Sequence, residues 1–251
     1  MMFSIEKWPI ILQFEVSADE MAALAELNVS MGLMLEQSTA SLMKTGGVHA
    51  AAPSKRPELR RAQLVQAGEL GVPFTTGLLL GIGESEADRL ETLEEIAELA
   101  DEYGHIGECI VQPYSVGESE ASLQKQKNTA AALGYDLEQL PAFVSKARAM
   151  LPSDVAVQVP PNLVLGSRPE ILRDCLDAGA TDLGGISPLD EVNPSYPFPD
   201  VAELKGTLAG WGYELKERLP VHDRHAGPPW VRARVLPVMA KWQARHAGPT
   251  V

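Results

Sequence analysis

The run Gly77-Leu-Leu-Leu-Gly-Ile-Gly-Glu84 decides how this chain folds. It is apolar and of strand length, yet it carries glycine where bulky β-forming residues would pack better. The run lies between a helix predicted to end at Ala67-Gly68 and a helix predicted to begin near Ser85. These features predict a buried parallel strand. The glycines indicate that something approaches its backbone closely, and we expect a ligand at its C-terminal end.

Strands and helices alternate on both sides of this run. The predicted strands cover 29–36, 72–80, 106–112, 155–159 and 182–186. Helices are predicted over 18–27, 57–69, 85–102, 136–150, 168–178 and 230–245, with a polar linker around Gly117. Ser17 and Glu20 have the spacing of a capping box at the start of the first helix. Such alternation is typical of right-handed βαβ units in a parallel sheet.

The strand count predicts an incomplete barrel. A closed (β/α)₈ barrel has eight strands, and five are predicted here. We expect an α/β fold of about five of the eight βα units, in one domain over 1–251. Residues 1–14 form an atypical N-terminus, 16–187 carry the βα units, and 188–251 are expected to wrap the barrel and end in a helix, without adding a strand.

Composition excludes several classes of partner. Lys plus Arg number 21 against 34 Asp plus Glu, a formal charge of −13, so we expect no nucleic acid as a partner. No apolar stretch reaches the roughly 20 residues that cross a bilayer, and the first residues lack a signal-peptide core, so we expect a cytoplasmic protein. Cys109 and Cys175 are too far apart in sequence for a metal motif and are expected to be small buried apolar residues.

Two charged residues are candidates for ligand contacts. Glu36 ends its predicted strand at the edge where barrels bind ligands, so its carboxylate could accept hydrogen bonds from a ribose diol. The alternative is a solvated strand end or an ion pair with a lysine. Arg56 could form a bidentate pair with a carboxylate, although an exposed cation at the start of a helix usually has no specific role, and the residues alone favour that second interpretation.

Other polar residues follow the predicted strands. Gln112, Asn162 and Ser187 suit recognition of a heterocycle or a polyol, and three at one predicted edge are better evidence than one. Glu84 is expected to cap the following helix. His222 and His225 have a His-x-x-His spacing, which is weak evidence for a metal without a helix to frame it. We therefore predict no metal site.

Several segments together resemble one enzyme family. The pattern Gly77-x-Leu79-x-Gly81-x-x-Glu84 resembles the adenine-contacting strand of radical S-adenosylmethionine (SAM) enzymes. In order along the chain, the following resemble the deazariboflavin synthase family of that superfamily: Met31-Gly-Leu-Met-Leu-Glu36, Ala52-Pro-Ser-Lys-Arg-Pro57, Pro73 to Glu84, Tyr103-Gly-His-Ile106, Val157-Gln-Val-Pro-Pro-Asn-Leu163, Gly184-Gly-Ile-Ser-Pro188 and Gly212-Tyr-Glu-Leu-Lys-Glu-Arg218.

The resemblance implies a chemistry and a set of contacts. It implies a barrel that binds SAM and a 4Fe-4S cluster, and a carbon–nitrogen lyase reaction that closes the deazaflavin ring from a hydroxybenzyl adduct of a ribitylated pyrimidine, releasing ammonia. It further implies a companion radical SAM subunit that makes the adduct. On matching positions, Glu36 would bind the ribose, Arg56 the SAM carboxylate, and the strand from Gly77 to Glu84 the adenine. Gln112, Asn162 and Ser187 would face the substrate.

The chain departs from that family in its cysteines. Two cysteines cannot form the C-x-x-x-C-x-x-C triad, so the cluster is expected for the family but not ligated by this chain. Two hypotheses follow: the C-terminal two-thirds of a synthase, or a cluster-free remnant that binds SAM or substrate without turnover, with 8–14 covering a sheet edge. A barrel lyase that uses Glu36 with a histidine has little support, because no acid–base pair emerges.

Overall fold

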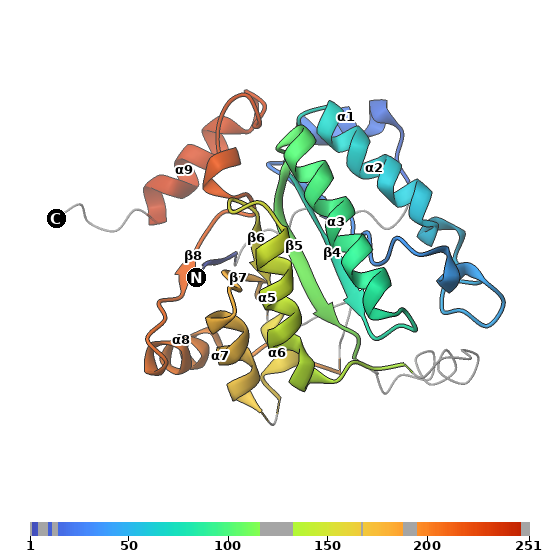
Figure 1. The fold of residues 1–251 in the computed structure, drawn as a ribbon. Coiled ribbons are helices and arrows are strands. Elements are labelled where there is room, and N and C mark those ends of the chain that lie inside the picture. Colours follow the sequence, from blue (N-terminus) through green and yellow to red (C-terminus); the bar gives the residue numbers. More distant parts are fainter. Residues whose placement is uncertain are drawn as a thin grey trace.

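The predicted parallel strands are confirmed. The computed structural model describes residues 2–4, 10–11, 15–115, 133–166, 168–187 and 195–246, so the linker around Gly117 lies outside it. Neighbouring strands pair in parallel and in sequence order through the middle of the sheet (Figure 1). They are β3 (Met31–Gly32), β4 (Phe74–Leu80), β5 (Ile106–Pro113), β6 (Ala156–Gln158) and β7 (Asp182–Gly185).

Three short strands extend this sheet beyond the prediction. They are β1 (Met2–Ser4), β2 (Ile10–Ile11) and β8 (Lys216–Glu217), and the full order is β2-β3-β4-β5-β6-β7-β1-β8. The expectation that the C-terminal tail adds no strand is wrong, because β8 pairs with β1. Two polar residues give no apolar alternation by which such a strand could be recognised. No ladder joins β2 to β8 among the described residues, so the barrel is open there.

Helices cover the outer face of the sheet. All six predicted helices form, and two others, α6 and α8, were not predicted. The last predicted helix begins only at Leu236. The helices are α1 (Ala18–Ala25), α2 (Pro57–Glu69), α3 (Glu86–Tyr103), α5 (Leu140–Met150), α6 (Pro161–Val164), α7 (Pro169–Asp177), α8 (Val201–Gly210) and α9 (Leu236–His246). The predicted capping box of Ser17 and Glu20 is present.

Side chains on the two faces of the sheet have different surroundings. Phe74 and Leu78 of β4 and Cys109 of β5 are fully buried in the apolar core to which the helices contribute. On the inner face, Leu79 and Gln112 lie opposite each other near the C-terminal ends of the same strands and are only half-buried. The inner face is therefore partly open where barrels bind ligands. Within the described part, no helix combines the length and apolarity needed to cross a membrane.

The opposite, N-terminal end of the strands is covered by residues 218–232, called here the basal segment. It is tied to the starts of β3, β4 and β5 by hydrogen bonds, which join Pro220 O to Ser30 Oγ, Arg232 Nη2 to Leu70 O at 2.7 Å, His225 Nε2 to Gly104 O at 2.7 Å, and Arg224 Nη2 to Ile106 O. In Figure 1 this segment and α9 lie at the end from which the arrows of β4 and β5 start.

Candidate functional site

Glu36 occupies a strained turn after β3. It is the one non-glycine residue with a positive φ, 65°, in the described part of the chain. The N–H of Gln37 donates to Leu35 O at 2.9 Å, so the turn is a γ-turn with a positive central φ, the rare and strained kind. Strain of this sort costs of order 1–3 kcal/mol and persists where the surroundings enforce it, often at ligand sites. Here β4 enforces it: Glu36 N donates to Gly77 O at 2.9 Å and Leu79 N donates to Glu36 O at 3.2 Å.

Three cationic or basic side chains surround the buried carboxylate of Glu36. Lys55 Nζ donates to Oε1, and Arg60 Nη1 lies 3.7 Å from the same oxygen. His49 Nε2 lies 2.9 Å from Oε2. Burial raises the pKa of the Glu36 carboxyl, but the contact with His49 and the charges of Lys55 and Arg60 outweigh it and lower this pKa from 4.5 to about 2. Glu36 is therefore ionised although it is buried.

Lys55 and Arg60 are the cations that face Glu36, and sequence reasoning did not single them out. The side chain of Arg56 is half exposed and pairs with Glu58, 2.7 Å from Nη2 to Oε1. Lys55 belongs to the quoted motif, and Arg60 is one helical turn beyond Arg56 on α2. Arg60 is 4% exposed, and a buried arginine needs an acceptor, but this burial is known only from the fold, so no sequence signal singled it out.

The glycines of β4 have packing reasons. A Cβ at Gly77 would lie 2.2 Å from Ile110 O and 2.7 Å from Ile110 N, so the element that approaches this backbone is the neighbouring strand β5. Gly81 has a φ of 85°, and a Cβ there would lie 2.4 Å from Gly134 O. The close approach to the backbone was predicted correctly. At both positions neighbouring backbone accounts for it, so a ligand is not needed to explain the glycine.

Glu84 shapes the loop after β4. Its carboxylate accepts hydrogen bonds from the N–H groups of Gly81 and Ile82, both at 2.7 Å, and from Arg89 Nε at 2.6 Å. The predicted capping role is wrong, because Ser85 caps α3 and accepts from Asp88 N. Glu84 instead closes the turn that precedes the cap, and this fixes the glycine loop at the edge of the sheet.

The uncharged polar candidates lie at the same edge. Gln112 is within β5 rather than after it, and its register partner is Leu79 of β4. Asn162 is in the first turn of α6, directly after β6, where its Nδ2 donates to Tyr196 O at 2.9 Å. Ser187 follows β7. All three therefore stand at the C-terminal ends of strands, as Glu36 does. Arg56 pairs with Glu58 rather than with the carboxylate of Glu36.

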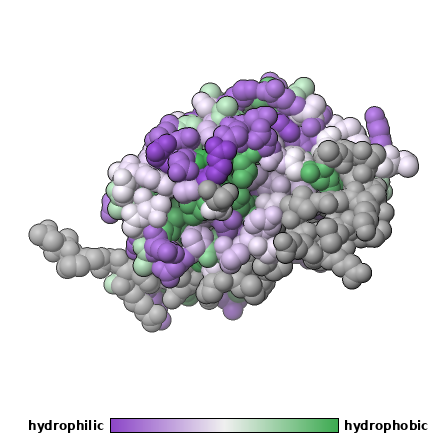
Figure 2. Space-filling view, turned by 90° about the horizontal axis from the view of Figure 1, so that it is seen from below, coloured by the Kyte–Doolittle hydropathy of each residue, from purple (hydrophilic) through white to green (hydrophobic). Residues whose placement is uncertain are grey.

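The face onto which these strand ends open is seen from below in Figure 2. Apolar surface lies there between hydrophilic side chains. An apolar floor with a few fixed polar groups is the usual composition of a small-molecule site.

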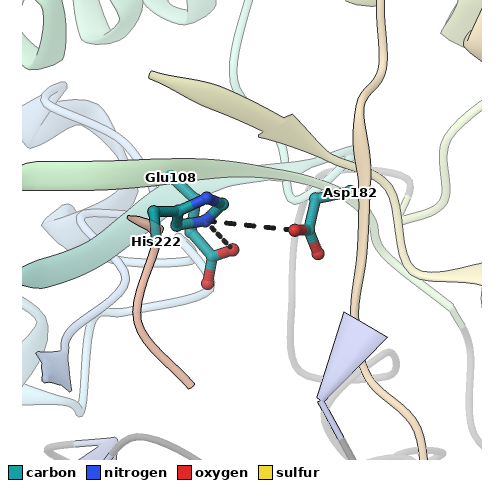
Figure 3. Close-up of side chains that lie close together, drawn as sticks. All are labelled: Glu108, Asp182 and His222. Carbon is teal, nitrogen blue, oxygen red and sulfur yellow. Dashed lines mark hydrogen bonds and ion pairs between the residues drawn. The ribbon is translucent and has the colours of Figure 1, made fainter. Parts of the chain in front are cut away.

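A second cluster of charges lies at the opposite end of the barrel (Figure 3). Glu108 near the start of β5, Asp182 at the start of β7 and His222 of the basal segment place their ligand atoms within 4.8 Å of one another. Arg218 bridges the two carboxylates, with Nη2 2.6 Å from Glu108 Oε2 and Nε 2.7 Å from Asp182 Oδ2. His222 Nε2 lies 3.1 Å from the same Glu108 oxygen.

This cluster has the character of a structural anchor. The oxygens that a metal would require already accept hydrogen bonds from Arg218, and Glu108 Oε1 accepts from Thr75 at 2.8 Å. His225, the second histidine of the His-x-x-His pair, has its Nε2 directed to Gly104 O rather than to the carboxylates. The N-terminal end of a barrel is also the end at which residues act in stability rather than catalysis. The Glu36 edge is therefore the candidate ligand site.

The cysteines of the chain do not fit an iron–sulfur cluster. Cys109 lies in β5 and Cys175 in α7, and both are fully buried in the apolar core. Burial raises the pKa of each thiol to about 12. A cluster needs thiolate ligands gathered at one place, and these two thiols are protonated and packed as apolar groups, as predicted.

No family model matches the chain. A 7,8-didemethyl-8-hydroxy-5-deazariboflavin synthase of Thermosynechococcus vestitus is 53% identical over 218 residues, which are 86% of this chain and 65% of that protein. The enzyme of the same name from Trichodesmium erythraeum is 44% identical over 230 residues, 92% of this chain and 68% of its own length.

The chain thus spans about two thirds of these relatives, and 57% of another. Among solved structures, a 3-keto-D-glucoside 4-epimerase from E. coli aligns with a TM-score of 0.37 and 13% identity, over 97% of this chain and 98% of that one.

Proposed function

Because this chain belongs to the 7,8-didemethyl-8-hydroxy-5-deazariboflavin synthase family, we propose that it acts in the synthesis of that deazaflavin, as the part of a radical SAM enzyme that holds SAM and the ribitylated substrate. The observation that carries the proposal is Glu36: a buried, ionised carboxylate held in a strained turn at the ligand-binding edge of the barrel. The chain spans about two thirds of the relatives' length, so the activity of the whole enzyme is part of the proposal.

The chemistry of Glu36 suits a vicinal diol. Its two oxygens can accept one hydroxyl hydrogen each, and an ionised acceptor makes each hydrogen bond shorter and stronger than a neutral one does. The half-buried apolar surface beside it, with Leu79 on β4, suits the flat face of a heterocycle. Adenosine carries both groups. The polar side chains of Gln112, Asn162 and Ser187 are proposed to meet the ribityl and pyrimidine parts of the substrate.

The cofactors enter this proposal in different ways. SAM, when bound, supplies the adenosyl group from which the radical of this enzyme class derives, and a companion subunit is proposed to supply the hydroxybenzyl adduct. The cysteines of the chain do not fit a 4Fe-4S cluster, so no step is derived through one. The role of this chain's residues is to bind and orient the two ligands and to exclude water from the inner face.

Calorimetric titration with SAM tests the assignment. The wild-type chain is expected to bind SAM, and Glu36→Gln is expected to weaken binding at least about tenfold, the loss of one charge-assisted hydrogen bond. Glu58→Gln is the matched control, because Glu58 is an exposed carboxylate that pairs with Arg56. Equal affinity of the wild type and Glu36→Gln for SAM would overturn the assignment of Glu36.

A further inference from the structure

Lys55 is the most exposed of the three groups around Glu36. The side chains of His49 and Arg60 are each 5% exposed, whereas that of Lys55 is 33% exposed. Arg60 is also anchored elsewhere, because it donates to Met34 O and, at 3.1 Å, to Ser54 O. Of the three, Lys55 alone reaches the carboxylate from solvent, so it is the group that an incoming ligand can replace.

We propose that Lys55 is a displaceable counter-ion of Glu36 and a positioning residue for SAM. A ribose hydroxyl of SAM displaces the Lys55 ammonium from Oε1 of Glu36. The released ammonium then binds the carboxylate of the methionine part of SAM. This inference rests on the proposed function, because it assumes that Glu36 meets a nucleoside. In this inference Lys55 binds the SAM carboxylate, the role that the resemblance implies for the next residue, Arg56.

The two oxygens of Glu36 explain why the lysine must leave. Oε2 faces the buried His49 at 2.9 Å, and Oε1 carries the contact with Lys55. A diol that donates one hydroxyl to each oxygen therefore competes with Lys55 at Oε1. The lysine end of this ion pair is open to water, which weakens the pair relative to a fully buried one. A hydroxyl that donates to the ionised carboxylate can therefore compete with Lys55 for Oε1.

The backbone around Lys55 is fixed, so only its side chain has to move. Lys55 ends the short 3₁₀ helix η2 (Pro53–Lys55), where its N–H donates to Ala52 O at 2.9 Å. The hydrogen bond from Arg60 to Ser54 O holds the preceding residue to α2. A four-carbon side chain on a fixed backbone can turn from Glu36 to a group bound beside it without a loop movement.

The proposal predicts opposite effects on two ligands. Adenosine has the diol but no carboxylate, so it meets Lys55 only as a competitor. SAM has both groups, so it loses an ionic contact when the lysine is absent. Lys55→Met keeps the length of the side chain and removes its charge. By calorimetry, we expect Lys55→Met to bind adenosine about two- to fivefold more tightly and SAM about tenfold more weakly than the wild type.

Two further variants make the result specific. Lys55→Arg restores a cation at this position and is expected to recover SAM affinity to within a few-fold of the wild type. Lys44→Met is the matched control: Lys44 is an exposed lysine of the same loop, and its replacement is expected to change neither affinity. Thermal unfolding of each variant shows whether it folds as the wild type does.

Each other outcome points to a definite alternative. If Lys55→Met weakens adenosine and SAM equally, or changes neither, Lys55 is not a displaceable counter-ion. If Arg56→Met weakens SAM and Lys55→Met does not, the carboxylate binds Arg56 and the inference is wrong. If the wild type binds neither ligand, or if Glu36→Gln binds both as well as the wild type does, the proposed function itself fails.

Discussion

Glu36 combines two unfavourable features, burial of a carboxylate and a positive φ. Its charge is retained because His49, Lys55 and Arg60 surround it, and its backbone is held by β4. The sequence predicted the position of Glu36 at a strand end, because an apolar run stopped there. The alternative interpretation, an ion pair with a lysine, is present with Lys55. The sequence did not predict which lysine, nor His49 and Arg60, because the loop and the helix that carry them are brought back to the end of β3 only by the tertiary fold.

Neutralising Glu36 is expected to change how stability depends on pH. The folded-state pKa of about 2 is below the ordinary 4.5, so the ionised carboxylate contributes stability that is present above pH 4.5 and is lost as the pH falls toward 2. Glu36→Gln should lower the free energy of unfolding by about 1–3 kcal/mol at pH 7. Urea unfolding from pH 7 to 3.5 should show this difference shrinking below about pH 4.5.

Glu58→Gln is the control for that series. Its carboxylate is exposed and pairs with Arg56 at the surface, so its replacement should leave the urea midpoint nearly unchanged at each pH. A difference between the wild type and Glu36→Gln that stays constant from pH 7 to 3.5 would show that the lowered pKa of Glu36 does not contribute to stability.

At the scale of elements, hydrophobic periodicity and the residues that cap or end helices and strands predicted most of the fold. The strands β3 to β7 and six helices were found because each lies in an apolar run or an amphipathic pattern bounded by caps, glycine or proline. The short strands β1, β2 and β8 were not found. Their place in the sheet depends on the strands beside them, and none of the three was recognised from a periodic pattern in the sequence.

The pair β4–β5 shows that a local glycine pattern predicts a crowded backbone but not the strand that crowds it. The glycine spacing correctly predicted a crowded backbone, but Gly77 faces Ile110 of the next strand, and the identity of that neighbour is a property of the sheet. Gly77→Ala should therefore force the two strands apart and lower the free energy of unfolding by about 1–3 kcal/mol, the usual cost of overpacking. Chemical denaturation measures this loss.

Gly206→Ala is the matched substitution. Gly206 lies inside α8, and a Cβ there would meet no atom within 4 Å. Alanine in a helix interior is more favourable than glycine by about 0.5–1 kcal/mol, so this variant should be slightly more stable. If both glycine variants changed stability in the same direction, the contact between Gly77 and Ile110 would not be the cause.

At the scale of the whole molecule, charge pairing joins the last part of the chain to the barrel. Arg218 bridges Glu108 and Asp182, which come from different strands. Burial, together with the charge of Glu108, raises the pKa of Asp182 even though Arg218 opposes the rise. The sequence analysis assigned no role to these residues, because a carboxylate inside an apolar strand gives no sign of which distant arginine it meets.

Removing that arginine should be costly. Arg218→Met leaves two buried carboxylates without their cation and is expected to lower the free energy of unfolding by about 3–5 kcal/mol at pH 7. The loss should become smaller as the pH falls, because protonation removes the uncompensated charges. Thermal unfolding at pH 7 and pH 5 measures both effects.

Arg173→Met serves as the reference, because Arg173 forms an exposed pair with Asp174. Its melting temperature should stay close to that of the wild type at both pH values. An Arg218→Met variant as stable as this reference at pH 7 would show that the bridge at the base of the barrel is dispensable.

The basal segment also has a consequence for the order of events during folding. Several of its hydrogen bonds join residues 110 to 190 positions apart, from Arg218 with Glu108 to Ser30 with Pro220. Contacts of such sequence separation slow folding, since the entropy of closing a long loop is lost before they form. A ribosome adds residues from the N-terminus at about 5–20 per second. The βα units therefore emerge and pair while the base of their sheet is still uncovered, and this end of the barrel becomes complete only when synthesis has passed residue 232.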